Sequence, residues 1–360
     1  MIKEKLQKIV HTIESKDLDA IILSEVPNVE YLLEIYVETP TVMIRVNRDS
    51  TYVIYVSKLD RDRIVDMLGL DESCVKTFSA IPGPDEISVK DVYRFLVKDC
   101  KKIGVDSVEL LEKLSKKVGN EISISGVKED IERIRSVKSE REIELIERSI
   151  KIAEKCLEET MHKVKPGARE IDVEALLTKI AIEHECALAF KPIVASGPNS
   201  AYPHHVSSTR RISRGDVVVI DFGTRYRCYC SDITRTIVVG STDGQVRDVM
   251  QAVAEAHRKA VSIVRKGIKT SEADLAAREV LREYGIDRYF IHSLGHGLGV
   301  ECHERPSISP VSEEIFESGN VITIEPGAYM RGMFGIRIED DYLVTDAGAR
   351  RLCSFPQLLI

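Results

Sequence analysis

The sequence predicts an α+β protein with two domains, a smaller α/β domain over residues 1–125 and a larger domain over residues 126–360. Three observations lead to this prediction. The chain has 360 residues, which is long for a single hydrophobic core. Strand-like and helix-like segments alternate through the first domain. The second contains two similar segments about 100 residues apart, which indicates two αβ halves related by a pseudo-twofold axis.

In the N-terminal domain, uninterrupted apolar runs predict buried strands, and amphipathic stretches predict helices. Helices are expected near residues 2–15, 58–68, 87–98 and 108–118, and strands at 19–24, 40–46, 51–56 and 101–106. The two middle strands flank the turn-like sequence NRDS and should form a β-hairpin. The segment 123–130, SISGVKED, is expected to join the two domains.

The C-terminal domain should open with a long amphipathic helix over about residues 138–163, and it then repeats itself. Segment 164–186 is similar to segment 264–285. GDVVVIDFG (215–223) is similar to GNVITIEPG (319–327), at an offset of 104 residues. In both, an apolar strand runs from a glycine to a carboxylate, and a second strand with another carboxylate follows. Each half is therefore expected to contribute one β-hairpin with two acids to a common centre.

Composition excludes several classes of protein. Hydrophobic residues make up 43% and charged residues 30% of the chain, as in soluble globular proteins. The net charge of −7 argues against nucleic acid as a partner. No apolar stretch is long enough to span a membrane, and the N-terminus lacks the apolar region of a signal peptide, so a cytoplasmic location is expected. The eight cysteines show no CxxC spacing typical of structural zinc.

Four carboxylates and one imidazole occupy places where a charge is unexpected. These residues are Asp221, Asp232, Glu325, Glu339 and His296. The acids lie in or at the ends of apolar strands, and the histidine lies between two glycines, which permit close approach of the backbone. Burying an unpaired carboxylate costs several kcal/mol, so the sequence predicts cations that neutralise these groups. Two divalent ions would balance four carboxylates.

Carboxylates with one imidazole suit Mn²⁺, Co²⁺, Fe²⁺ or Zn²⁺ better than a structural zinc site, which prefers cysteine and histidine. Carboxylates can also bridge two ions, as in hydrolases that activate a water molecule. Each acid alone has an ordinary alternative explanation. Asp232 could pair with the nearby Arg235, and Glu339 could be one of the acids that often end a strand. The five residues together, on repeated elements, favour a metal centre.

These segments resemble a known family. DFGTRYRCYCSDITRT, HSLGHGLGVECHERP, ITIEPGAYM and GIRIEDDYLVT are similar to the signature of the Xaa-Pro peptidases, the prolidase and aminopeptidase P branch of the pita-bread metallopeptidases. The resemblance is strong over about residues 135–350. It implies a C-terminal pita-bread (creatinase/aminopeptidase) domain after an N-terminal creatinase-like domain. It also implies a cytoplasmic homodimer that binds peptides with proline at the second position.

The resemblance implies roles for particular residues. Asp221 would hold one ion, Asp232 and Glu339 would bridge both, and His296 and Glu325 would hold the other. Catalytic roles would fall to His204, His303 and Glu325, with the adjacent His205 as an alternative to His204. Arg337 would order the acidic cluster.

Hydrolysis of Xaa-Pro dipeptides is the first reading of this resemblance, and aminopeptidase P activity on longer peptides is the alternative. Many dipeptide-specific members carry an arginine where this chain has Ser307, and Arg305 lies two residues earlier, which favours the alternative. A non-catalytic binding protein of the same fold is a more remote reading, as is a metal-free hydrolase that resembles creatinase. Because all five ligand positions are filled, both are disfavoured.

Overall fold

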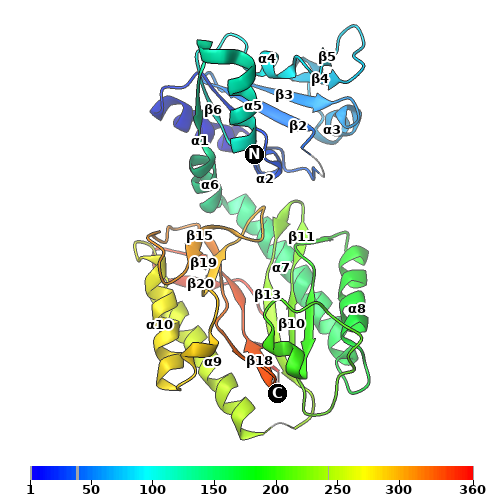
Figure 1. The fold of residues 1–360 in the computed structure, drawn as a ribbon, viewed down its shortest axis with the longest axis vertical. Coiled ribbons are helices and arrows are strands. Elements are labelled where there is room, and N and C mark those ends of the chain that lie inside the picture. Colours follow the sequence, from blue (N-terminus) through cyan, green and yellow to red (C-terminus); the bar gives the residue numbers. More distant parts are fainter. Residues whose placement is uncertain (1, 38–39, 242, 360) are drawn as a thin grey trace. The chain divides into compact units, whose positions relative to one another are not determined.

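The computed structural model describes residues 2–37, 40–241 and 243–359. The chain divides into two compact units, residues 1–135 and 136–360. Unit 1 contains one seven-stranded sheet in the order β5-β4-β3-β2-β1-β6-β7 (Figure 1). Its strands are β1 (Ala20–Leu23), β2 (Val42–Asn47), β3 (Tyr52–Ser57), β4 (Val75–Ser79), β5 (Ile87–Ser88), β6 (Lys102–Val105) and β7 (Ser123–Gly126). Its helices are α1 (Ile2–Ser15), α2 (Val26–Leu33), α3 (Arg61–Leu68), α4 (Val92–Leu96), α5 (Val108–Val118) and α6 (Lys128–Ser136).

Apolar side chains cover both faces of this sheet, so unit 1 is a three-layer α/β structure. Ile21 and Leu23 of β1 pack with α1, α2 and α3, whereas Ala20 and Ile22 pack with α4 and α5. This alternation follows from the two-residue period of a strand and explains why β1 reads as a continuous apolar run. The predicted first helix, the hairpin β2–β3 and the strand β6 are confirmed.

Two predictions for the first 135 residues are wrong. Residues 87–98 are not one helix: Ile87 and Ser88 extend the sheet beside β4, and the helix begins only at Val92. Residues 123–126 are not a linker, since they form the edge strand β7, which pairs in parallel with β6. Helix α6 then buries Ile131 in the core of unit 1. The division of the chain after Arg135 therefore falls ten residues later than residue 125.

Unit 2 consists of two halves with the same order of elements. The first half contains α7 (Glu140–Thr160), α8 (Glu170–Glu183), β8 (Ala187–Leu188), β9 (Ile193–Ser196), β10 (Val217–Phe222), β11 (Thr224–Tyr226), β12 (Tyr229–Cys230) and β13 (Ile233–Val238). The second contains α9 (Gly244–Ile263), α10 (Thr270–Glu283), β14 (Gly295–Gly297), β15 (Glu304–Ile308), β16 (Val321–Ile324), β17 (Gly327–Met330), β18 (Phe334–Arg337) and β19 (Asp340–Val344). The chain ends with β20 (Ala349–Arg351) and β21 (Leu358–Leu359).

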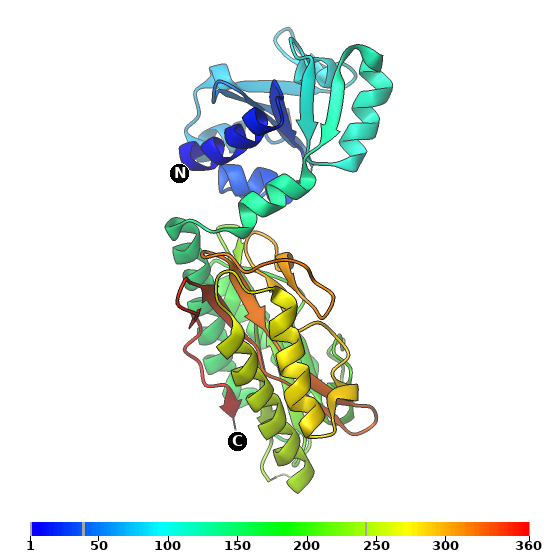
Figure 2. The ribbon, with the colours of Figure 1, turned by 90° about the vertical axis from the view of Figure 1, so that its left-hand side faces the viewer.

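The predicted repeat is observed in the two halves of unit 2. In each, two helices lead to an antiparallel pair, β10 with β13 and β16 with β19, and a small hairpin interrupts each pair. Helices α9 and α10 lie side by side on one side of unit 2, and α7 and α8 lie on the other (Figures 1 and 2). Helix α7 begins with the capping box that Ser139 and Glu142 form.

Among the residues that the structure describes, no helix combines the length and apolar character needed to cross a bilayer.

Candidate active site

All five residues predicted to bind metal line a single cavity of about 460 Å³ in unit 2. His204, His303 and Arg337, the other residues singled out in the sequence, line it as well. Its remaining walls are formed by Phe190, Ile193, Pro203, His292, Ser293, Gly295 and Ser307. The structure therefore brings together residues that lie up to 149 positions apart in the chain (Phe190 to Glu339).

The acids stand where the two repeated strand pairs meet. Asp221 is in β10, opposite Thr234 of β13, and Asp232 immediately precedes β13. Glu325 follows β16 and Glu339 precedes β19, at the equivalent end of the second pair. The halves are joined directly, because the backbone N–H of Glu339 donates to the carbonyl of Thr234 (3.2 Å). The Thr234 hydroxyl in turn donates to Oε2 of Glu339 (2.6 Å).

Burial and mutual repulsion make these carboxylates hard to ionise without a cation. Burial raises the pKa of Asp232 well above its ordinary value, and the charges of Glu339 and Asp221 raise it further. Burial, together with Glu325 and Asp221, acts in the same direction on the pKa of Glu339. The pKa of Glu325 rises to about 8, chiefly through burial. Such a cluster is stable in its ionised form only when positive charge is supplied.

The donor atoms fit divalent metal ions. Ligand atoms of Asp232, His296 and Glu339 all lie within 4.8 Å of one another. Oδ1 of Asp221 and Oδ1 of Asp232 are buried, and within the described part of the chain neither has a hydrogen-bond partner. Buried polar atoms nearly always have a hydrogen-bond partner. Oxygens without one are therefore expected where a cation binds.

His296 is oriented as a ligand through Nε2. Its Nδ1 lies 3.1 Å from the carbonyl of Gly297 and donates to it, which leaves the Nε2 lone pair facing Glu325 Oε1 (3.3 Å) and Asp232 Oδ2 (3.8 Å). The flanking glycines permit this placement. A Cβ at Gly295 would stand 2.1 Å from the carbonyl oxygen of Thr323, and one at Gly297 would stand 1.9 Å from that of Arg305. The predicted close backbone approach is thus observed.

Arg337 organises one side of the cavity. Its guanidinium donates to Asp221 Oδ2 (2.5 Å), to the Thr234 hydroxyl (3.0 Å) and to the Tyr329 hydroxyl (2.7 Å). Although burial opposes its charge, Tyr329 and Asp221 raise the pKa of Arg337 well above the ordinary value. The arginine therefore stays charged and holds one oxygen of Asp221 while the other remains available.

Sequence reasoning missed His292 and Tyr329. The Tyr329 hydroxyl donates to Nε2 of His292 (2.9 Å), whose Nδ1 donates to the carbonyl of Ser293 (2.8 Å). Burial lowers the pKa of His292 to about 3, so the imidazole is neutral. One signal could have found this histidine: it lies four residues before His296 in the same glycine-containing segment.

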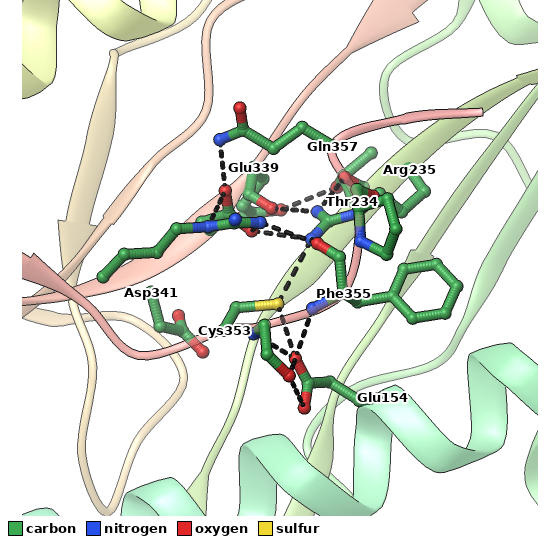
Figure 3. Close-up of polar contacts among 12 residues, drawn as sticks. Glu154, Thr234, Arg235, Glu339, Asp341, Cys353, Phe355 and Gln357 are labelled. Carbon is green, nitrogen blue, oxygen red and sulfur yellow. Dashed lines mark hydrogen bonds and ion pairs between the residues drawn. The ribbon is translucent and has the colours of Figure 1, made fainter. Parts of the chain in front are cut away.

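Arg235 is not the partner of Asp232. It is fully buried and pairs with Asp340 (Nη2 to Oδ1, 2.6 Å), while Nη1 donates to the carbonyls of Thr234 and Glu339 (Figure 3). It also donates to the carbonyls of residues 355 and 356, which tie the C-terminal segment to both strand pairs. The ordinary explanation for Asp232, an ion pair with its neighbour, is therefore excluded.

The adjacent histidines 204 and 205 face different surroundings. His204 lines the cavity, whereas Nε2 of His205 lies 2.9 Å from Oε2 of Glu170. His303 lines the cavity from the opposite half, and its ring centroid lies 4.2 Å from that of His296. Burial and the neighbouring His296 lower the pKa of His303, so its imidazole is neutral at pH 7.

Comparison with known proteins agrees with this geometry. The chain is 36% identical to the Xaa-Pro dipeptidase of Pyrococcus horikoshii over 364 aligned positions, which cover 100% of this chain and 99% of that protein. The crystal structure of the prolidase from Pyrococcus horikoshii superposes with a TM-score of 0.88 at 35% identity, covering 99% of this chain and 100% of that one. The X-Pro aminopeptidase from Thermotoga maritima superposes with a TM-score of 0.87 at 31% identity, covering 99% of each chain.

Residues 144–346 match metallopeptidase family M24, and residues 5–137 match the creatinase/prolidase N-terminal domain. The M24 match covers more than half of the chain and includes every residue that lines the cavity. The chain therefore belongs to metallopeptidase family M24 and carries a creatinase/prolidase N-terminal domain before its peptidase domain.

Proposed function

We propose that this enzyme is an Xaa-Pro dipeptidase, a prolidase, that works with two divalent metal ions. The observation that carries the proposal is the convergence of four acids and one imidazole on one cavity, where two buried carboxylate oxygens have no hydrogen-bond partner among the described residues. The names of the relatives support the substrate class, since the Pyrococcus horikoshii protein that spans the whole chain is called an Xaa-Pro dipeptidase.

Asp221, Asp232, His296, Glu325 and Glu339 would hold the ions, and the family resemblance implies that Asp232 and Glu339 serve both. Mn²⁺, Co²⁺, Zn²⁺ and Fe²⁺ all suit this set of oxygen and nitrogen donors. When bound, such ions lower the pKa of water and polarise the scissile carbonyl.

The residues of the chain itself would direct the reaction. His204 and His303 border the cavity from opposite halves and can hydrogen-bond the carbonyl oxygen as negative charge develops on it. They can also relay the proton that Glu325 would take from the water to the departing nitrogen. Glu325, which lines the cavity, would accept a proton from the attacking water, and Arg337 would keep Asp221 in position through its hydrogen bond to that carboxylate.

The cavity is suited to a proline residue. The bond before proline is a tertiary amide without an N–H, so a peptidase that acts through the carbonyl needs no donor there. Phe190, Ile193 and Pro203 are apolar residues that line the cavity and would contact the proline ring. Ser307 lines the cavity, whereas Arg305 pairs with Glu314 (2.8 Å).

Peptide length should separate the dipeptidase from the aminopeptidase. We expect Xaa-Pro dipeptides to have a higher kcat/KM than Xaa-Pro-Xaa tripeptides with the same first residue, measured with Mn²⁺ and with Co²⁺. Gly-Xaa dipeptides without proline serve as the control. Faster turnover of the tripeptides would instead assign aminopeptidase P activity, and equal cleavage of the control dipeptides would remove the proline specificity.

Metal should also stabilise the fold. Adding Mn²⁺ to chelator-treated protein should raise the unfolding temperature, because the ions neutralise buried carboxylates; a ligand at 100 times its Kd contributes about 2.7 kcal/mol. Differential scanning fluorimetry with and without chelator measures this. Asp221→Asn should weaken the response, whereas Asp346→Asn, an exposed carboxylate paired with Lys266, should not. An unchanged unfolding temperature in saturating metal would contradict the proposed site.

We also propose a homodimer in the cytoplasm, as the family resemblance suggests. Sedimentation of the purified protein tests the first of these proposals, and fractionation of the source cells tests the second.

A further inference from the structure

The loop that carries His204 is tied to the first residue of helix α8. This residue, Glu170, is fully buried, and its carboxylate accepts six hydrogen bonds. Oε1 accepts from Ser196 N (2.7 Å), Ser196 Oγ (2.7 Å) and Asn199 Nδ2 (3.0 Å), and Oε2 accepts from His205 Nε2 (2.9 Å), Ser208 N (3.0 Å) and Ser208 Oγ (2.7 Å). The donors lie on both sides of His204, so one carboxylate closes residues 196–208 into a fixed loop.

Glu170 is well suited to hold this loop. Burial alone would raise its pKa, but the hydrogen bonds from Ser208, Ser196 and His205 outweigh burial and lower the pKa to about 2. The carboxylate is therefore ionised near neutral pH, and its hydrogen bonds are charge-assisted, about twice as strong as neutral ones. Its place at the N-terminus of α8 adds a favourable interaction with the helix dipole.

The two adjacent histidines of this loop have different roles, since one binds Glu170 and the other faces the cavity. The ring of His205 is bound to Glu170, which fixes the backbone at that position, and the neighbouring side chain of His204 then faces the cavity. The backbone adds support, since His205 N donates to the carbonyl of Tyr202 (3.1 Å). Without the carboxylate, four side chains of the loop would lose their common acceptor, namely those of Ser196, Asn199, His205 and Ser208.

The second half of unit 2 has a related arrangement. Thr270, the first residue of α10, lies 100 positions after Glu170. Its hydroxyl donates to the carbonyl of Ser307 (2.7 Å), four residues beyond His303. The start of the second helix thus contacts the histidine-bearing segment in both halves, through a carboxylate in the first half and through a hydroxyl in the second.

We propose that Glu170 is a positioning residue that holds loop 196–208 through His205 and Ser208, so that His204 is directed into the cavity. This inference rests on the proposed function for the chemical role of His204. It does not involve the proposed metal ligands, because the hydrogen bonds of Glu170 within the described part of the chain go to Ser196, Asn199, His205 and Ser208.

The test is Glu170→Gln, which keeps the shape of the side chain and removes its charge. The expected result is a 10- to 100-fold lower kcat on an Xaa-Pro dipeptide, the usual range for residues that orient an active-site group, with unchanged metal content. In a His204→Ala background the same substitution should change kcat less than about threefold, because the residue that it positions is gone. Glu142→Gln is the matched control: this glutamate is also buried near a helix start, and accepts from Ser139 and Tyr229 outside the cavity.

Hydrogen exchange gives a readout that does not depend on activity. Amides of residues 197–208 should exchange faster in Glu170→Gln than in the wild-type protein, while residues 301–304 keep their protection. If the wild-type protein does not cleave Xaa-Pro peptides but the loop still loosens, the proposed function fails and the structural link stands.

An equal loss of kcat in the wild-type and His204→Ala backgrounds, a loss of metal, or unchanged exchange of the loop would each overturn the inference. Should Glu170→Gln fail to fold, His205→Ala removes one donor and leaves the carboxylate in place. It should lower kcat by up to about tenfold and loosen the same loop. Unchanged kcat and exchange in this variant would overturn the link through His205.

Discussion

Glu339→Ala should abolish hydrolysis of Xaa-Pro dipeptides and leave each chain with at least one divalent ion fewer. Ligand atoms of Glu339, Asp232 and His296 lie within 4.8 Å of one another, so this carboxylate would help to hold a bound ion, and the family resemblance implies that it bridges two. Loss of activity should exceed the 10- to 100-fold effect of residues that only support metal ligands. Metal analysis of the reconstituted protein, together with turnover at saturating substrate, measures both effects.

Glu339→Gln separates loss of metal from loss of the fold. Glutamine preserves the volume and an oxygen that can accept from Thr234, but it removes a charge. A carboxyl whose pKa is raised on folding destabilises the folded protein above its unfolded pKa, so removing the charge should not lower the unfolding temperature of the metal-free protein near neutral pH. The stabilisation by Mn²⁺ should nevertheless be lost. A variant that keeps both ions and full turnover would refute the bridging role.

The acids of the site could be predicted because each violates a local rule. Asp221 and Glu325 stand at the ends of strands that are otherwise apolar, and such positions are costly for a charge without a partner. The repeat at an offset of about 100 residues then predicted that two strand pairs bring their acids together. The sequence pattern thus contained both the chemical anomaly and the symmetry that explains it.

The contacts that orient these residues could not be predicted in the same way. Asp232 and Arg235 are close in sequence, yet the arginine crosses to Asp340 on the other strand pair. Glu170 looks like any acid in the first turn of a helix, where such residues are common. Its role depends on Ser196 and Ser208, which fold back over the helix start and are 26 and 38 positions away. Local propensity carries no information about such partners.

The edge strand β7 could not be predicted for a related reason. Ser123 to Gly126 has the serine and glycine content of a linker, and only its pairing with β6 makes it a strand. Edge strands of this kind have a single neighbour and weak side-chain patterns, so sequence alone favours a loop.

His204→Ala should lower kcat by about 10²- to 10⁴-fold, the usual range for a positioned acid or base, while the metal content stays at the wild-type value. His204 lines the cavity, but within the described part of the chain it forms no hydrogen bond or ion pair with the proposed metal ligands, so its removal should leave those ligands in place. KM should change less than kcat, because a group that acts mainly on developing charge contributes little to ground-state binding.

His205→Ala is the matched comparison, since it removes the same side chain one position away. Its imidazole contacts Glu170 rather than the cavity, so its effect should be at most about tenfold and should come from loosening the loop. If His205→Ala caused the larger loss, or if His204→Ala released metal, the two histidines would have exchanged roles. The relative loss of kcat in the two variants therefore decides which histidine acts on the substrate. The structure predicts a much larger loss for His204→Ala than for His205→Ala.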